Sequence, residues 1–120
     1  VSAVLPARLL EGAGQETWVF PGDEALAAAR HLPALRRAIR LHERVVLHYV
    51  DGDGIASERP LRPLLLEFWG RVWTLAAWCE TREDFRSFRV DRIGQVHPTG
   101  EPFPDAPGTT LADWRRLQGG

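Results

Sequence analysis

Residues 45–54 read Val-Val-Leu-His-Tyr-Val-Asp-Gly-Asp-Gly, and this stretch decides the fold. β-branched and aromatic residues favour an extended strand, and two Asp-Gly pairs directly after them predict a hairpin turn. The return strand is predicted roughly from Ala56 to Phe68. Pro60 and Pro63 lie inside it and cannot donate hydrogen bonds to a ladder, so we expect an edge position or a bulge there.

The strand pattern continues toward the C-terminus. Gly70 allows a tight turn, and Val72 to Cys79 is predicted as the next strand. Two shorter strands follow, from Ser87 to Val90 and from Ile93 to His97. About five short strands joined by tight turns and bulges favour a small curled antiparallel barrel over a flat sheet, so the fold class is mainly β with flanking helices.

Two helices are predicted before the strands. Asp23 is a good N-cap for the Ala-rich run from Glu24 to Leu32. Pro33 fits the first turn of a second helix, from Ala34 to Glu43, because the missing N–H costs nothing there.

A short helix is predicted at the C-terminal end. The proline-rich stretch from Pro98 to Pro107 is predicted to be an extended connector. Thr110 then caps the helix, with Asp113 at the third helical position as in a capping box. Leu111, Trp114 and Leu117 form the apolar side of this helix.

Composition limits the possible functions. The chain has 120 residues, which is one domain's worth. Its net charge is −1, so any anion site must be a local one. No stretch is apolar enough to span a membrane. All fifteen basic residues are Arg, which we attribute first to genomic base composition, and the absence of Met predicts that the chain is a piece of a longer protein.

Catalytic and metal-binding patterns are poor. Cys79, the single cysteine, is predicted to be a buried structural thiol, and it excludes an internal disulfide or a cysteine zinc cage. The four histidines show no ligand spacing, so no metal is expected. No serine lies in a nucleophile elbow, and no glycine-rich phosphate loop is present, so no cofactor is expected and an enzyme is disfavoured.

The stretch from Thr81 to Ile93 carries four arginines and two phenylalanines within eleven residues. Guanidinium groups beside aromatic rings suit a ligand with negative charge and a flat ring, such as a nucleotide or single-stranded nucleic acid. The alternative is a solvated strand edge whose arginines pair with local carboxylates. In a straight strand Arg86 and Arg89 face opposite sides, so their convergence requires a bulge or an arginine from another element. A helix would instead place Arg82, Arg86 and Arg89 on one face.

The aromatic residues are predicted mainly as packing groups. The Tyr49 ring is expected in the core, with its hydroxyl requiring a partner at the rim. Trp73 is expected to point inward with Leu75, and Trp69 at the turn to be exposed.

From about Leu35 to Val96 the chain resembles the WYL domain of bacterial transcriptional regulators. The last block of the resemblance is the most specific part. The matching features are Ala38-Ile39, Val45 to Tyr49 with the Asp-Gly turn, Arg59 to Pro63, Trp69-Gly70, Trp73 to Cys79 and Phe85 to Ile93. One departure is that Thr74 stands where the family has its namesake Tyr.

The resemblance implies an Sm-like, SH3-type barrel that follows a winged helix-turn-helix domain. Residues 1–22 would connect the two, residues 23–98 would form the effector-sensing domain, and residues 99–120 the connector and last helix. It also implies a cytoplasmic homodimer that binds operator DNA through the preceding domain. The effector would be anionic, nucleotide-like or single-stranded nucleic acid.

Site roles carried over from the resemblance form one cationic pocket. Arg86 and Arg89 would clamp a phosphate, Arg59 would add a second cationic wall, and Tyr49 would donate its hydroxyl. Arg92 is assigned less surely, and Trp73 and Phe88 are candidates for stacking. The alternative function is a dimerisation or protein-interaction module without a small ligand. A hydrolase or nuclease would need a His–carboxylate pair in a cleft.

Overall fold

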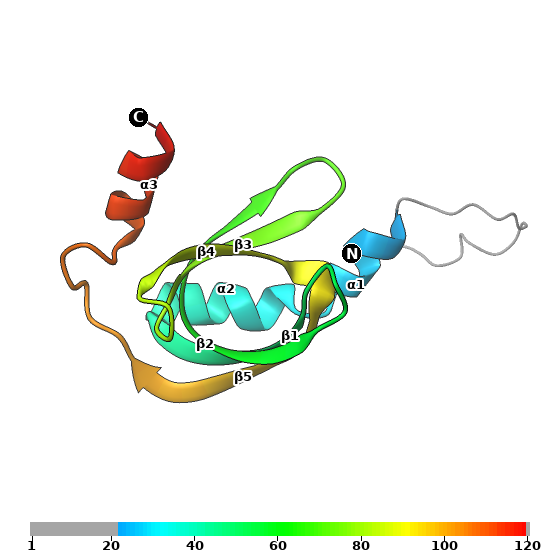
Figure 1. Ribbon diagram of the computed structural model, residues 1–120, viewed down its shortest axis with the longest axis horizontal. Coiled ribbons are helices and arrows are strands. Elements are labelled where there is room, and N and C mark those ends of the chain that lie inside the picture. The colour runs from blue at the N-terminus through cyan, green and yellow to red at the C-terminus, as the bar shows by residue number, and fades with distance from the viewer. Residues whose placement is uncertain (1–21, 120) are drawn as a thin grey trace, which may run out of the picture.

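The computed structural model describes residues 22–119, with side chains from Leu26 onward (Figure 1). Nearly all of the predicted connecting segment 1–22 therefore lies outside the described residues. In chain order the elements are α1 (Gly22–Ala29), α2 (Leu32–Leu41), β1 (Glu43–Val50), β2 (Ala56–Phe68), β3 (Trp73–Cys79), β4 (Asp84–Arg89), the 3-10 helix η2 (Val90–Arg92), β5 (Ile93–Pro102) and α3 (Leu111–Gly119).

The five strands form one antiparallel sheet in the order β4-β3-β2-β1-β5. This confirms the mainly β fold with flanking helices. The sheet is strongly curled, as Figure 1 shows. Tyr49 on β1 and Phe88 on β4 are separated by two strands in the sheet, yet their ring centroids lie 5.1 Å apart. The curl therefore brings the two halves of the sheet into contact on its concave face.

The predicted closed barrel is not formed, because β4 and β5 remain the two edges of an open sheet. The chain turns from one edge to the other through the three residues of η2. β5 then follows β1, from Ile93 opposite Tyr49 to Pro102 opposite Glu43, and so runs away from β4. Side chains fill the opening, since Val90 and Ile93 are buried.

The amphipathic helix α2 covers the concave face of the sheet (Figure 1). Its residues Leu32, Leu35 and Ala38 are buried, and they join an inner core that includes alternate residues of β1, as period-2 packing requires. A smaller cluster lies on the outer face, where Trp114 of α3 packs with Phe103.

α1 and the start of α2 pack against η2. The buried His31 contacts the corner directly, with its Nε2 2.8 Å from the carbonyl oxygen of Ile93. Burial lowers the pKa of His31, and the nearby Arg30 charge adds to this effect. The His31 side chain therefore joins the turn between α1 and α2 to the start of β5.

Of the two outcomes expected for the prolines of β2, a bulge is present next to Pro63, whereas an edge position is wrong because β2 lies between β1 and β3. The register with β3 shifts between Pro63 and Leu65. Pro60 lies one residue beyond the last β2–β3 pair, Leu61 with Cys79. The position of the missing Pro60 donor faces the side where the Pro60 carbonyl accepts the Glu80 N–H (3.0 Å), so the β1–β2 ladder on the other side loses no bond.

Several predicted boundaries were wrong. The first helix spans Gly22–Ala29, so Asp23 lies inside it, and β4 begins at Asp84 rather than Ser87. The second helix ends at Leu41 rather than Glu43, because His42 adopts a left-handed conformation (φ 53°) and Glu43 already begins β1. The expected connector from Pro98 is partly strand, since β5 continues to Pro102 along the first residues of β1.

The capping box of α3 is confirmed. The Asp113 N–H donates to Thr110 Oγ1 (3.1 Å), and the Thr110 N–H donates to Asp113 Oδ2 (3.1 Å). The apolar side of the helix is less covered than expected, because Trp114 is buried but Leu117 is exposed.

Candidate functional site

The concave face of the sheet brings together three of the predicted site residues. Arg59 lies opposite Leu47, a core residue, so its side chain starts on the same face as the inner core. The Arg59 guanidinium carbon lies 5.8 Å from the centroid of the Phe88 ring. This is cation–π range, and it joins β2 to β4 across the curl.

Tyr49 is the third member of this group. Its ring meets Phe88 edge to face (80°) and is 8% exposed, which confirms the predicted core position. Its hydroxyl oxygen accepts the backbone N–H of Arg89 (3.0 Å), which is the rim partner that a buried phenol needs. The phenolic hydrogen is not used in that bond.

Arg86 and Arg89 are not brought together. Arg86 pairs with Ala77, whose side chain belongs to the inner core, whereas Arg89 pairs with Thr74 on the other face of β3. β4 is a regular strand without a bulge, so alternation sends the two side chains to opposite faces. Arg86 therefore shares the concave face with Phe88.

Arg89 is also neutralised locally. Its Nε and Nη2 donate to the two carboxylate oxygens of Asp91, at 2.9 Å and 2.8 Å. Burial alone would raise the pKa of Asp91, but the hydrogen bonds and charge of Arg89 hold it below its usual range. This bidentate pair makes Arg89 a poor partner for a second anion.

Arg59 and Arg86 differ from Arg89 in this respect. Within residues 22–119 neither of them forms an ion pair, and the Arg59 Nε donates to the neutral hydroxyl of Ser57 (2.9 Å). Asp51, in the β1–β2 turn, is close enough to Arg59 for the two charges to interact. Hydrogen bonds from the Ile55 and Asp53 N–H groups, followed by the charges of Arg59 and Arg92, lower the pKa of Asp51.

The remaining candidates lie at the margins of this group. Arg92 is exposed on η2, beside Gly52 of the turn. Trp73 is half-buried against the inner core, and its ring is covered by the guanidinium of Arg36 at 5.7 Å and by Phe68 at 5.0 Å. No sequence pattern pairs Arg36 with Trp73, because no local feature relates α2 to β3.

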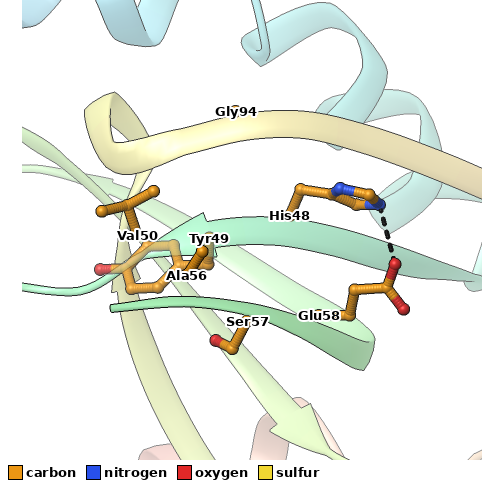
Figure 2. A pocket seen from close by; sticks show the side chains of 7 residues that line it. All are labelled: His48, Tyr49, Val50, Ala56, Ser57, Glu58 and Gly94. Atoms are coloured by element: carbon orange, nitrogen blue, oxygen red, sulfur yellow. Dashed lines mark ion pairs between the residues drawn. The ribbon is translucent and has the colours of Figure 1, made fainter. Parts of the chain in front are cut away.

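A hollow of about 290 Å³ lies where the β1–β2 hairpin meets β5 (Figure 2). His48 and Glu58 line it, with Nε2 and Oε2 3.3 Å apart. A hydrolase needs such a pair, but the adjacent Ser57 lies on the opposite face of β2 and accepts a hydrogen bond from Arg59. Figure 2 shows Ser57 turned away from the pair. No nucleophile–base contact is formed by these side chains.

Within residues 22–119 no three side chains of His, Cys, Asp or Glu gather as a metal site would require. In the same part of the chain, no helix has the length and apolar character needed to cross a bilayer.

The outer face carries a second set of arginines. Glu80 Oε2 accepts hydrogen bonds from the Nε atoms of Arg44 (2.5 Å) and Arg62 (2.9 Å). Arg62 also reaches Thr109, and Arg44 reaches Glu101. This Glu80 network joins β1, β2 and β3 to β5 and to the segment before α3.

Comparisons with known proteins agree with this fold. The chain is 38% identical over 65 residues to the DNA-binding transcriptional repressor CapW of Escherichia coli and of E. coli strain KTE188. The match covers 53% of this chain but only 22% of each curated relative. In structure the chain is similar to the proteasome accessory factor B/C (PafBC) of Arthrobacter aurescens, with a TM-score of 0.62 and 26% identity over 68% of this chain and 13% of that chain.

Residues 30–98, more than half of the chain, match the WYL domain family. The matched residues contain β1 to β4, η2 and the whole concave group described above. The chain therefore belongs to the WYL domain family.

Proposed function

We propose that this chain is the effector-sensing domain of a DNA-binding transcriptional regulator. It binds an anionic effector, nucleotide-like or single-stranded nucleic acid, and controls DNA binding by a separate domain. The relatives support the regulatory role: CapW is named as a DNA-binding repressor. Because the match covers about a fifth of CapW, DNA binding is assigned here to parts outside the match.

One observation supports the proposal that the ligand is anionic. Two guanidinium groups, those of Arg59 and Arg86, share the concave face without a carboxylate partner in the described chain. Arg59 and Arg86 are half-buried, and a partly desolvated cation is stabilised by an anion or by hydrogen bonds. A phosphate at this face would supply that compensation, with about 1.5–3 kcal/mol from each charge-assisted contact.

The surrounding residues have distinct roles in this proposal. Tyr49 accepts the Arg89 N–H, so its own O–H is free to donate to a ligand oxygen. Phe88 is 3% exposed and is covered by Arg59, so the flat guanidinium, rather than the phenyl ring, would meet a base. Arg92 adds positive charge at the rim.

The alternative is a non-enzymatic dimerisation module without a small ligand. The Arg89–Asp91 pair favours it, because one predicted ligand-binding arginine is already satisfied within the chain. The alternative predicts a concentration-dependent dimer and no change in melting temperature with nucleotides or oligonucleotides.

The test is binding of a fluorescent single-stranded oligonucleotide, and of a nucleoside triphosphate, to the wild type, Arg59→Ala and Arg86→Ala at two salt concentrations. We expect each substitution to weaken binding about tenfold or more, and the salt dependence to become shallower. Arg82→Ala is the matched control, because Arg82 is an exposed arginine outside the concave face. Equal affinities for all four proteins would refute the proposal.

A further inference from the structure

A second hollow lies on the outer face of the sheet, away from the concave group. It measures about 460 Å³ and is lined by Glu67, Trp69, Thr74, Ser87, Trp114 and Gln118. Its walls come from α3 and from the β2–β3 hairpin, which rise on the same side of the sheet in Figure 1. Trp114 of α3 packs with Phe103 on the outer face of the sheet, and Trp114 and Gln118 of the same helix form one wall of the hollow.

Two indole rings and one carboxylate face this space. Trp69 is 63% exposed, as predicted, and its Nε1–H donates to Thr74 Oγ1 (2.9 Å). The N–H lies in the ring plane, so this bond fixes the ring by its edge and leaves the π faces outside the contact. Trp114, which is 7% exposed, contributes a second indole to the lining, and Glu67 contributes a carboxylate.

Glu67 is the one charged residue among the six that line the hollow. Arg89 lies opposite Thr74 on the same face, but its guanidinium is matched by both oxygens of Asp91. None of the six lining residues is basic. The π faces of indoles attract cations, and a desolvated site strengthens that attraction.

Thr74 contributes a small side chain to the lining of this space. The family has a tyrosine at this position, and a phenol projecting from β3 would occupy the volume next to Trp69. Threonine leaves the volume empty and supplies only the hydroxyl that holds the indole.

We propose that the hollow between Trp69, Trp114 and Glu67 binds a small organic cation of the alkylammonium class. This site is separate from the anion site of the proposed function, because it lies on the other face of the sheet. The aromatic rings would contact the alkyl groups, and Glu67 would balance the charge.

The test is a choline titration of the 120-residue chain, in which binding is measured from the NMR signal of the Trp114 indole N–H. The uncharged 3,3-dimethylbutan-1-ol, which has the same shape, is titrated in parallel. We expect saturable binding of choline only. Glu67→Gln and Trp69→Ala should each weaken it about two- to fivefold, and Thr74→Tyr should abolish it by filling the space. Leu117→Ala is the control, because Leu117 is exposed on α3 but does not line the hollow.

Two results would overturn the proposal: equal affinity for the neutral alcohol, or an unchanged choline affinity in Glu67→Gln and Trp69→Ala. Glu67 is half-buried and Trp69 is exposed, so both variants should fold. Their melting temperatures check this. Oligonucleotide binding should be the same in Trp69→Ala as in the wild type, so failure of one site is distinguished from failure of the other.

Discussion

Two sets of arginines in this domain differ in what compensates their charge. On the outer face Arg44 and Arg62 converge on Glu80. On the concave face Arg59 contacts the Ser57 hydroxyl and the Phe88 ring, and neither Arg59 nor Arg86 forms an ion pair within the described chain. The same side-chain chemistry thus stabilises the sheet on one side and remains available on the other. The two faces therefore differ in whether a carboxylate, here Glu80, pairs with the arginines.

The largest effect should come from removing that carboxylate. Glu80→Ala leaves two arginines, whose side chains are only 27% and 16% exposed, without their acceptor. We expect a loss of about 2–3 kcal/mol in the free energy of unfolding, measured by urea denaturation. Glu101→Ala removes a 70%-exposed partner of Arg44 and should cost less than about 0.5 kcal/mol. Similar losses for the two variants would contradict the contrast between the two faces.

The Glu80 network should also make stability depend on pH. Burial would raise the pKa of Glu80, but the hydrogen bonds and charges of Arg44 and Arg62 lower it. A carboxyl whose folded pKa is lowered contributes stability above its unfolded pKa, and this contribution is lost as the pH falls through the folded value. The free energy of unfolding should therefore fall below about pH 4.3 in the wild type, and fall less in Glu80→Gln. Parallel pH profiles would exclude Glu80 as a source of this dependence.

A smaller effect is expected from Tyr49→Phe on the concave face. It removes the acceptor for the buried Arg89 N–H while keeping the ring against Phe88. The expected cost is about 1 kcal/mol in thermal or chemical unfolding. Oligonucleotide affinity should fall as well, which a purely structural hydroxyl would not cause.

The smallest stability change is expected where the ligand effect is largest. Arg86→Ala breaks no ion pair within the described chain, so the free energy of unfolding should change by less than about 0.5 kcal/mol. Arg59→Ala also removes the contact with the Phe88 ring and should cost at most about 1 kcal/mol. A loss comparable to that of Glu80→Ala would mean that these arginines are structural, and it would favour the dimerisation module.

Local signals in the sequence predicted the fold well. The alternation from Val45 to Tyr49, the Asp-Gly turn and the Thr110–Asp113 capping box all depend on neighbours within a few residues, and each is present in the structure. The predicted barrel was wrong, because closure depends on whether the two edge strands, β4 and β5, pair with each other.

The candidate site was only partly predictable. Alternation correctly warned that Arg86 and Arg89 face opposite sides, and Asp91 two residues away pairs with Arg89, as the alternative interpretation required. The contact of Arg59 with Phe88 joins residues 29 positions apart and exists only because the sheet curls. No pattern along the chain could reveal it.

The three residues of η2 have a mechanical consequence. Val90 is buried in the core, and the Ile93 carbonyl contacts the His31 ring. The Tyr49 hydroxyl accepts the N–H of Arg89, the last residue of β4. A three-residue connection cannot change its length appreciably. A densely packed interior transmits a displacement instead of absorbing it. Any shift of the β4 end must therefore break one of these attachments or be carried to the helices.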